Sequence, residues 1–271
     1  MALFSKLALV ALWFSLIGPL HAQADQAGAV VQINTRPGVT VPVFELWNNN
    51  AVATVVLFSG GAGGYGKIGV DGWPASKNFL IRTGKLWAAH AFNIVMVGRP
   101  SDGIDLHDGA VRVGDEHGAD NVAVFKAIKN KSPLPMWVVG TSMGSISAAS
   151  AAIHDADNLV AGVVLTSSVT AYRIRGAVPG QELAKIRVPV LVVHHARDAC
   201  KSCTPYEAKN IPSALTNSPR KEMVLIEAGS APSGDPCEPM HYHGYIGAEP
   251  EVVALIASWI AKANPELTPR V

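Results

Sequence analysis

Ser142 stands at the centre of the sequence Gly-Thr-Ser-Met-Gly, with Gly140 and Gly144 at its two ends. The residues 137–139 before it are apolar and suit a buried strand, and the Ala- and Ser-rich run 145–153 after it suits a helix. A strand, a sharp turn and a helix in this order form the context in which a serine acts as a nucleophile. Glycines on both sides remove the Cβ atoms that would collide where the two chains approach each other. We therefore predict an activated serine, although a plain turn between a strand and a helix also fits the short pattern.

A serine hydroxyl is a poor nucleophile until a base removes its proton, and a carboxylate orients and stabilises that base. Asp198 follows an apolar run of strand length and is the candidate acid; the alternative is an aspartate that only begins a loop. His241 and His243 lie between the last strand-like run and the final stretch of helical spacing, and both are candidates for the base. The sequence thus supplies a nucleophile, an acid and a base.

Apolar runs of strand length recur along the chain and alternate with stretches of helical spacing. We expect strands at 29–34, 39–47, 52–58, 92–97, 136–140, 159–166, 188–194 and 222–227, and helices at 76–91, 115–129, 206–215 and 249–262, besides the one after Ser142. Pro42 indicates an edge position for the second strand. The alternation predicts an α/β fold, with a mostly parallel central sheet and helices on both faces.

In sheets of this kind the ligand site forms at the carboxyl ends of the strands. Ser142, Asp198, the histidine loop and the glycine-rich segment 59–66 each follow an expected strand, so we expect all of them at one edge. The segment 59–66 lacks the Lys-Ser/Thr ending of a P-loop and the ribose-binding acid of a dinucleotide site. We interpret it as a loop whose backbone N–H groups approach a substrate oxygen; the alternative is a flexible turn.

The order Ser142, Asp198 and a late histidine resembles the α/β-hydrolase superfamily, whose nucleophile, acid and base follow one another in this order. The resemblance covers nearly the whole of residues 25–271 and is strongest at the Gly-Thr-Ser-Met-Gly motif. It implies the α/β-hydrolase fold. The segment 167–181 is short and loop-like, so we expect at most a minimal lid.

The same resemblance assigns further residues. His243-Gly244-Tyr245 is similar to a His-Gly-aromatic turn of secreted members, which favours His243 over His241 as the base. The N–H groups of Met143 and Gly61 are implied as the donors that stabilise an oxyanion. Ser59 departs from the family pattern, because a histidine often stands there, and this leaves the second donor open.

The function that the resemblance implies is an exported serine hydrolase that cleaves an ester-type acyl bond of a small-molecule substrate through an acyl-enzyme. Amide cleavage or acyl transfer would use the same residues, and a non-catalytic ligand-binding protein is the alternative of another class. Neither a cofactor nor a metal is implied. His107 and His117 have acids nearby, but their spacing fits no metal site. We expect Tyr65, Trp73 and Tyr245 as pocket walls or as packing residues.

Three cysteines, Cys200, Cys203 and Cys237, leave one thiol over if one bridge forms. Cys200-x-x-Cys203 has the spacing of a redox motif, but it is followed closely by a proline and by no convincing helix start. We hypothesise a Cys200–Cys237 bridge that ties the loop after Asp198 to the loop before His243; Cys203 is the rival partner. Such a tie would hold acid and base in register.

Residues 1–24 resemble a signal peptide: Lys6 is their single charge, 7–20 are almost wholly apolar, and Ala22-Gln23-Ala24 fits a cleavage site. We expect residues 25–271 to form a single periplasmic or secreted domain. Without Lys6 the chain holds 21 basic and 21 acidic residues, which gives no electrostatic footprint for nucleic acid or acidic lipid. No later segment is long and apolar enough to cross a bilayer, and the sequence does not indicate an oligomeric state.

Overall fold

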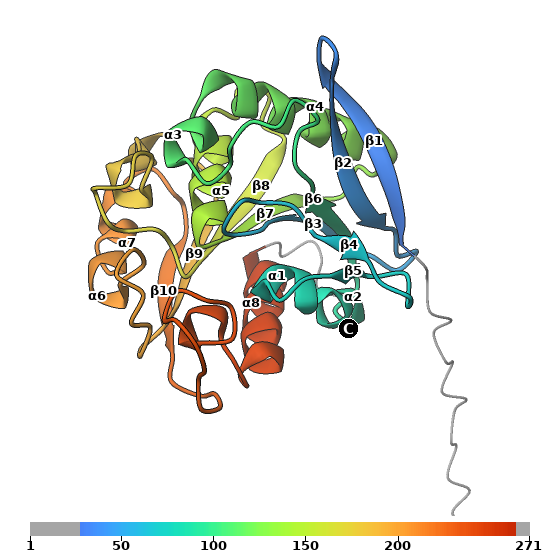
Figure 1. Cartoon of the computed structure of the whole chain (residues 1–271). Helices are drawn as coiled ribbons and strands as arrows, with labels where there is room; N and C mark the ends of the chain where they lie inside the picture. Colours follow the sequence, from blue (N-terminus) through green and yellow to red (C-terminus); the bar gives the residue numbers. More distant parts are fainter. Residues whose placement is uncertain (1–27, 264–271) are drawn as a thin grey trace, which may run out of the picture.

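The computed structural model describes residues 28–263, so the expected signal peptide at 1–24 lies outside the described residues (Figure 1). An eight-stranded sheet runs through the molecule. From one edge to the other its strands are β1 (Ala29–Arg36), β2 (Val39–Leu46), β6 (Phe92–Val97), β3 (Ala53–Phe58), β7 (Met136–Thr141), β8 (Val160–Thr166), β9 (Val190–His195) and β10 (Lys221–Ile226).

The sheet is mostly parallel, as the sequence predicts. β1 pairs antiparallel with β2, and β2 pairs antiparallel with β6, while every other neighbouring pair is parallel. The edge position expected from Pro42 is wrong, because β1 covers β2. Pro42 is tolerated inside the sheet because its carbonyl accepts from the Gly98 N–H at 2.8 Å, so its ring nitrogen faces the side where β6 has already ended.

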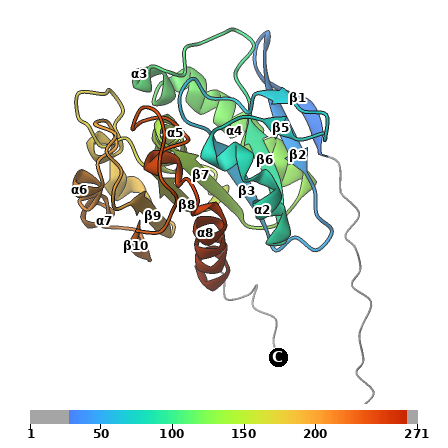
Figure 2. The same cartoon turned by 60° about the horizontal axis from the view of Figure 1, so that its bottom comes forward.

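Helices cover both faces of the sheet (Figures 1 and 2). One face carries α1 (Phe79–Arg82), α2 (Gly84–Ala89) and α8 (Glu249–Ala263); the other carries α4 (Asp115–Lys131), α5 (Met143–Ile153), α6 (Pro205–Ala208) and α7 (Ile211–Ala214). The central strands alternate between two buried clusters: Val55 and Leu57 pack on the α8 side, Val56 and Phe58 on the α4 and α5 side. The predicted architecture is therefore confirmed.

Two expected helices are each divided into short pieces. The stretch 76–91 forms α1 and α2, which meet at Thr83, whose hydroxyl donates to the Phe79 carbonyl at 2.7 Å. The stretch 206–215 forms α6 and α7, and each begins with a proline in its first turn. A two-stranded hairpin of β4 (Lys67–Ile68) and β5 (Pro74–Ala75) was not expected from the sequence.

The connection between β8 and β9 contains only two short 3-10 turns, Val178–Gly180 and Leu183–Lys185. This agrees with the expected minimal lid. Within residues 28–263, none of the helices is both long enough and apolar enough to cross a membrane.

Candidate active site

Ser142 occupies the turn between β7 and α5, and its backbone has φ 52° and ψ −126°. A positive φ is unfavourable for a residue with a side chain and persists only where the surroundings enforce it. Here the enforcement comes from close packing: a Cβ on Gly140 would overlap the Gly144 carbonyl, and a Cβ on Gly144 would overlap the Phe58 carbonyl. The glycines thus have the role that the sequence predicts for them.

Hydrogen bonds hold the same turn. The Ser142 N–H donates to the Thr166 carbonyl at 3.1 Å, and the Ser142 carbonyl accepts from the Ser145 hydroxyl at 2.6 Å. Ser145 in turn accepts from the Val169 N–H at 3.1 Å, which ties the start of α5 to the loop after β8. The Ser142 side chain remains partly exposed and lines a cavity.

Asp198 and His243 form the second part of the site. His243 Nδ1 lies 2.8 Å from Asp198 Oδ2, and both side chains are buried. The other Asp198 oxygen, Oδ1, accepts from the Cys200 N–H at 2.9 Å, so the carboxylate is fixed at both ends. His243 Nε2 is buried and has no hydrogen-bond partner among the described residues. An imidazole held at Nδ1 and free at Nε2 can accept a proton there.

The loop that carries His243 is anchored on the end of the sheet. The His243 carbonyl accepts from the Ser167 hydroxyl at 2.8 Å, and the Tyr245 hydroxyl donates to the Val193 carbonyl at 2.7 Å. Gly244 is required because a Cβ there would overlap the Pro239 carbonyl. The His-Gly-Tyr turn therefore places His243 against Asp198.

His241, the alternative base, makes no hydrogen bond to Asp198 among the described residues; its ring packs edge-on against Tyr242. His194 is fully buried and feels the charges of Asp198 and His243, and its Nε2 accepts from the Ser168 N–H at 2.8 Å. Burial lowers the pKa of His194 to about 4, which keeps its ring neutral near pH 7. The geometry thus favours His243 over the other histidines.

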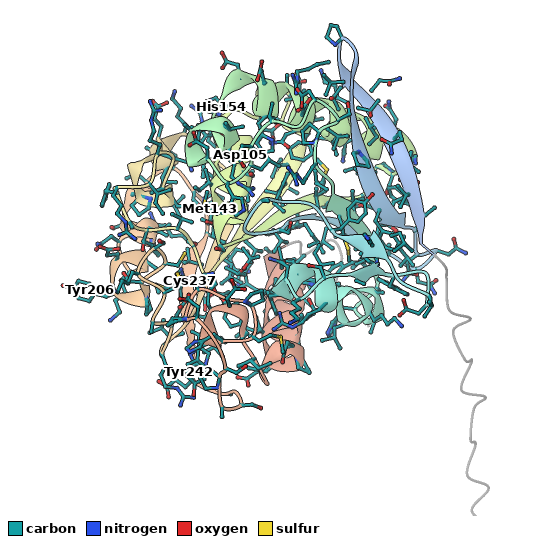
Figure 3. All side chains as sticks on the ribbon, viewed as in Figure 1. Asp105, Met143, His154, Tyr206, Cys237 and Tyr242 are labelled. Carbon is teal, nitrogen blue, oxygen red and sulfur yellow. A yellow bond between two sulfur atoms is a disulfide. The ribbon has the colours of Figure 1, made fainter. Side chains whose placement is uncertain are left out.

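The structure contains the hypothesised Cys200–Cys237 disulfide and leaves Cys203 free and buried. In Figure 3 Cys237 and Met143 lie in the central part of the view, whereas Tyr206 projects from the periphery. The Cys203 sulfur lies within 4.8 Å of the Cys200 sulfur and of a His243 ring nitrogen. Burial raises the pKa of the Cys203 thiol, so it is protonated near pH 7.

Cys200, Cys203 and His243 are also the group that could hold a metal ion within the described part of the chain. The Cys200 sulfur is already committed to the disulfide, and His243 Nδ1 to Asp198. Two ligands at most remain, fewer than a protein zinc site uses.

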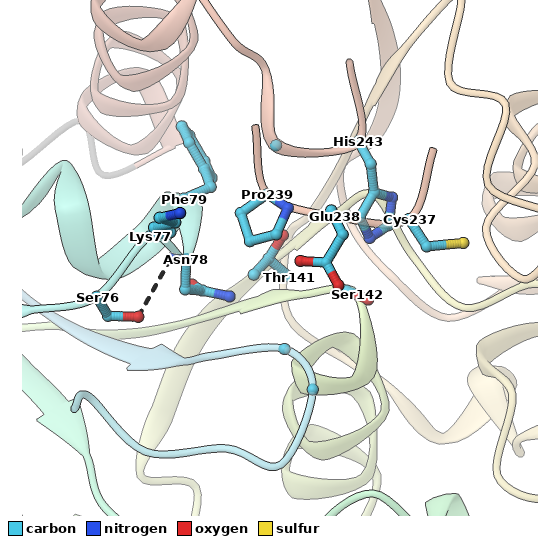
Figure 4. Close-up of a pocket in the computed structure, with 13 residues that line it drawn as sticks. Ser76, Lys77, Asn78, Phe79, Thr141, Ser142, Cys237, Glu238, Pro239 and His243 are labelled. Atoms are coloured by element: carbon cyan, nitrogen blue, oxygen red, sulfur yellow. Dashed lines mark hydrogen bonds between the residues drawn. The ribbon is translucent and has the colours of Figure 1, made fainter. Parts of the chain in front are cut away.

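A cavity of about 280 Å³ opens in front of Ser142 (Figure 4). It is lined by residues of the glycine-rich loop, of the segment before α1, of the serine turn and of the histidine loop: Gly60, Gly61, Ser76, Lys77, Asn78, Phe79, Thr141, Ser142, Cys237, Glu238, Pro239, His243 and Gly244. The glycine-rich loop, the serine turn and the histidine loop meet at the carboxyl ends of the strands, as expected, whereas residues 76–79 were not expected at this edge. The pocket-wall interpretation of Tyr65, Trp73 and Tyr245 is wrong: Tyr65 and Trp73 pack on Phe44, and Tyr245 is fully buried.

The glycine-rich loop after β3 is held in one shape by polar contacts. The Ser59 hydroxyl donates to the Gly64 carbonyl at 2.5 Å, and the Gly60 carbonyl accepts from the Gly63 N–H at 3.1 Å. The N–H groups of Gly60 and Gly61 donate to no acceptor among the described residues. Gly61 lines the same cavity as Ser142, and Met143 begins α5 immediately after Ser142.

Arg112 is a residue of this site that sequence reasoning missed. It belongs to α3 (Gly109–Arg112), is 1% exposed, and donates from Nη2 to the Gly61 carbonyl at 2.9 Å and from Nη1 to the Ser147 hydroxyl at 2.8 Å. Desolvation lowers its pKa to about 9. Its position in a long polar stretch suggested an exposed side chain, and no local signal marks it as buried.

His117, considered above for a metal, belongs to the same buried network. Its Nε2 lies 2.9 Å from the Ser147 hydroxyl, which also accepts from Arg112. Burial, reinforced by the nearby Arg112 charge, lowers the pKa of His117 to about 4. His117 is therefore a neutral packing residue near pH 7.

No protein-family model matches the sequence, and a search of curated proteins found no match. Solved structures do match. An esterase of Pyrococcus furiosus gives a TM-score of 0.62 at 14% identity over 87% of this chain and 90% of that one. A dienelactone hydrolase of Anabaena variabilis gives a TM-score of 0.60 at 14% identity over 87% of this chain and 97% of that one.

A third match, an α/β serine hydrolase without lid from Xanthomonas campestris, gives a TM-score of 0.56 at 13% identity over 94% of this chain and all 100% of that one. Identities this low establish a shared fold and nothing finer. Together with the sheet order and the helices on both faces, they show that this chain has the α/β-hydrolase fold.

Proposed function

We propose that this chain is an exported serine hydrolase that cleaves an ester-type acyl bond through an acyl-enzyme, with Ser142 as nucleophile, His243 as base and Asp198 as acid. One observation carries the proposal. His243, which is paired at Nδ1 with the buried Asp198 and has no partner at Nε2 among the described residues, lines the same cavity as Ser142, whose backbone φ is positive. A serine hydroxyl becomes nucleophilic when such an imidazole accepts its proton.

The residues divide the reaction as follows. Ser142 Oγ attacks the acyl carbon while its proton passes to His243 Nε2, and Asp198 stabilises the imidazolium that results. The N–H groups of Met143 and Gly61 donate to the oxyanion. His243 then protonates the leaving alcohol. In the second half of the reaction His243 takes a proton from a water molecule, the water attacks the acyl carbon, and His243 returns the proton to Ser142 Oγ as the acid leaves. The small cavity and the short β8–β9 connection favour a small or accessible acyl substrate.

The ester bond in the proposal follows from the sequence resemblance to esterase-like hydrolases; the matched esterase and dienelactone hydrolase share the fold with this chain and do not themselves separate an ester from an amide bond. Export is supported by the signal-like residues 1–24 and by the Cys200–Cys237 disulfide, since such bonds persist in oxidising compartments.

The test is turnover of a series of 4-nitrophenyl esters of increasing acyl length by the purified protein. We expect a preferred acyl length, and losses of roughly 10⁴-fold or more in kcat for Ser142→Ala and His243→Ala. His241→Ala is the matched control and should retain turnover. A folded protein that hydrolyses none of the esters, yet binds one of them, would support the non-catalytic alternative instead.

A further inference from the structure

Asn78 lines the cavity on the side away from His243 and has no role in the reaction described so far. In Figure 4 Asn78 lies to the left of Thr141, and Ser142 and His243 lie to the right of it. Asn78 precedes α1 and caps its start: its Oδ1 accepts from the Leu80 N–H at 3.1 Å. The local sequence suggests only this capping role, since asparagine is a favoured residue at helix starts.

The hydrogen bond to Leu80 fixes the orientation of the whole amide. Because Oδ1 is committed to the helix, Nδ2 points the other way, toward the cavity (Figure 4). The Asn78 backbone is held as well, because its N–H donates to the Ser76 hydroxyl at 3.2 Å. Among the hydrogen bonds of residues 28–263, none uses Nδ2 as a donor. A pre-oriented donor therefore faces the cavity without a protein acceptor.

The Asn78 amide and the Ser142 side chain lie on two sides of a narrow gap at Gly60. A Cβ placed on Gly60 would lie 3.4 Å from Asn78 Nδ2, 2.9 Å from Ser142 Cβ and 3.1 Å from the Thr141 carbonyl oxygen. The absence of a side chain at Gly60 keeps this gap open. Asn78 Nδ2 therefore borders the part of the cavity next to Ser142 in which an acyl oxygen would bind.

We propose that Asn78 is a catalytic residue whose Nδ2–H donates a hydrogen bond to the oxyanion, as a third donor beside the N–H groups of Met143 and Gly61. The assignment rests on the proposed function. A neutral amide held by the helix start is already oriented before the substrate binds, so it needs no rearrangement when negative charge develops. It also supplies a side-chain donor next to Gly60 of the glycine-rich loop.

Asn78→Asp separates this role from capping. The aspartate has nearly the same shape and still accepts from the Leu80 N–H, but it places an oxygen where the donor was. We expect an unchanged free energy of unfolding, a fall in kcat of about 100-fold and a change in KM of only a few-fold. The affinity for an aryl boronic acid, which forms a tetrahedral adduct with serine, should fall together with kcat.

The matched control is Asp108→Asn, the reverse exchange at the cap of α3, where Asp108 Oδ1 accepts from the Ala110 N–H at 2.8 Å. It should leave kcat unchanged. A wild-type kcat in Asn78→Asp, with loss of stability in Asn78→Ala, would overturn the assignment and leave Asn78 as a cap alone. If wild-type protein neither hydrolyses esters nor binds the boronic acid, the proposed function fails and this assignment fails with it.

Discussion

Cys200 and Cys237 join, through a disulfide, the loop that begins at Asp198 to the loop that leads to His243. The Cys200 N–H also donates to Asp198 Oδ1, and Cys237 lines the cavity, so the bond lies beside the groups whose 2.8 Å contact it maintains. The loops of the acid and the base are therefore linked twice, covalently by the disulfide and non-covalently by the Asp198–His243 hydrogen bond.

Replacing Cys237 by alanine should weaken both the fold and the reaction. The two cysteines are 37 residues apart in sequence, and opening a loop of that size lowers the free energy of unfolding by about 2 to 4 kcal/mol. Freed loops also misplace His243 relative to Asp198, so kcat should fall more than KM rises. Urea unfolding and ester kinetics measure the two effects.

Cys203→Ala is the control for that experiment, because it removes the buried thiol and leaves the bridge intact. Its cost should be that of a small cavity, about 1 kcal/mol. Peptide mapping without reductant should find Cys200 joined to Cys237. A Cys200–Cys203 peptide in wild-type protein would contradict the pairing.

Gly144→Ala should prevent the serine turn from forming. The added Cβ would overlap the Phe58 carbonyl, which belongs to a central strand and cannot move aside. We expect low yield of folded protein or a loss of more than about 3 kcal/mol of stability, measured by thermal unfolding. Gly118→Ala offers the matched control, because Gly118 lies on α4 and a Cβ added there would have no atom within 4 Å. It should raise stability by about 0.5 to 1 kcal/mol; equal losses in the two variants would refute the packing argument.

Arg112 should support the reaction from a distance, through the shape of the glycine-rich loop. Arg112→Lys keeps a charge but cannot serve Leu106, Ser147 and Gly61 together, as the guanidinium does. We expect about a tenfold lower kcat with little change in KM, and a lower free energy of unfolding. Arg112→Met should lower both kcat and the free energy of unfolding further than Arg112→Lys does. An unchanged kcat in either variant would show that the Gly61 loop keeps its shape without Arg112.

The fold and most of the site could be predicted from the sequence because local patterns carry them. Buried strands appear as apolar runs, and Gly140 and Gly144 mark the turn at Ser142 by their spacing alone. The meeting of Ser142, Asp198 and His243 follows from topology, since the carboxyl ends of parallel strands share one edge.

The remainder could not be predicted because it depends on contacts between segments distant in sequence. The burial of Arg112 depends on Gly61 and Ser147, which are 51 and 35 residues away. Pro42 looked like an edge residue because the sequence around it does not show where the neighbouring strand β6 ends. In the structure β6 ends next to Pro42, at the point where a hydrogen-bonding partner for an N–H group would be needed. Asn78 carries a helix cap as its only local signal, and the cavity it faces is formed by other loops.

Stability should decline in mild acid because two histidines are buried in neutral form. The pKa values of His117 and His194 are lowered by burial to about 4, while an unfolded histidine takes up its proton near 6.5. Between these values the unfolded chain binds more protons, so stability falls as the pH falls through this window. Each histidine contributes a slope of up to about 1.4 kcal/mol per pH unit.

Urea unfolding between about pH 7.5 and pH 5 measures that slope. His117→Gln should reduce it by up to one proton equivalent, whereas His90→Gln, at an exposed position, should leave it unchanged. An identical slope in wild type and His117→Gln would mean that His117 binds its proton equally well in the folded and the unfolded protein, which contradicts the lowered pKa.

Labelling with a fluorophosphonate probe tests most directly whether Ser142 is an activated nucleophile. The account predicts one label per chain, mapped to Ser142, that is absent in Ser142→Ala, abolished or greatly slowed in His243→Ala, and retained in His241→Ala. Folded wild-type protein that stays unlabelled, or that carries its label on another serine, would contradict the account.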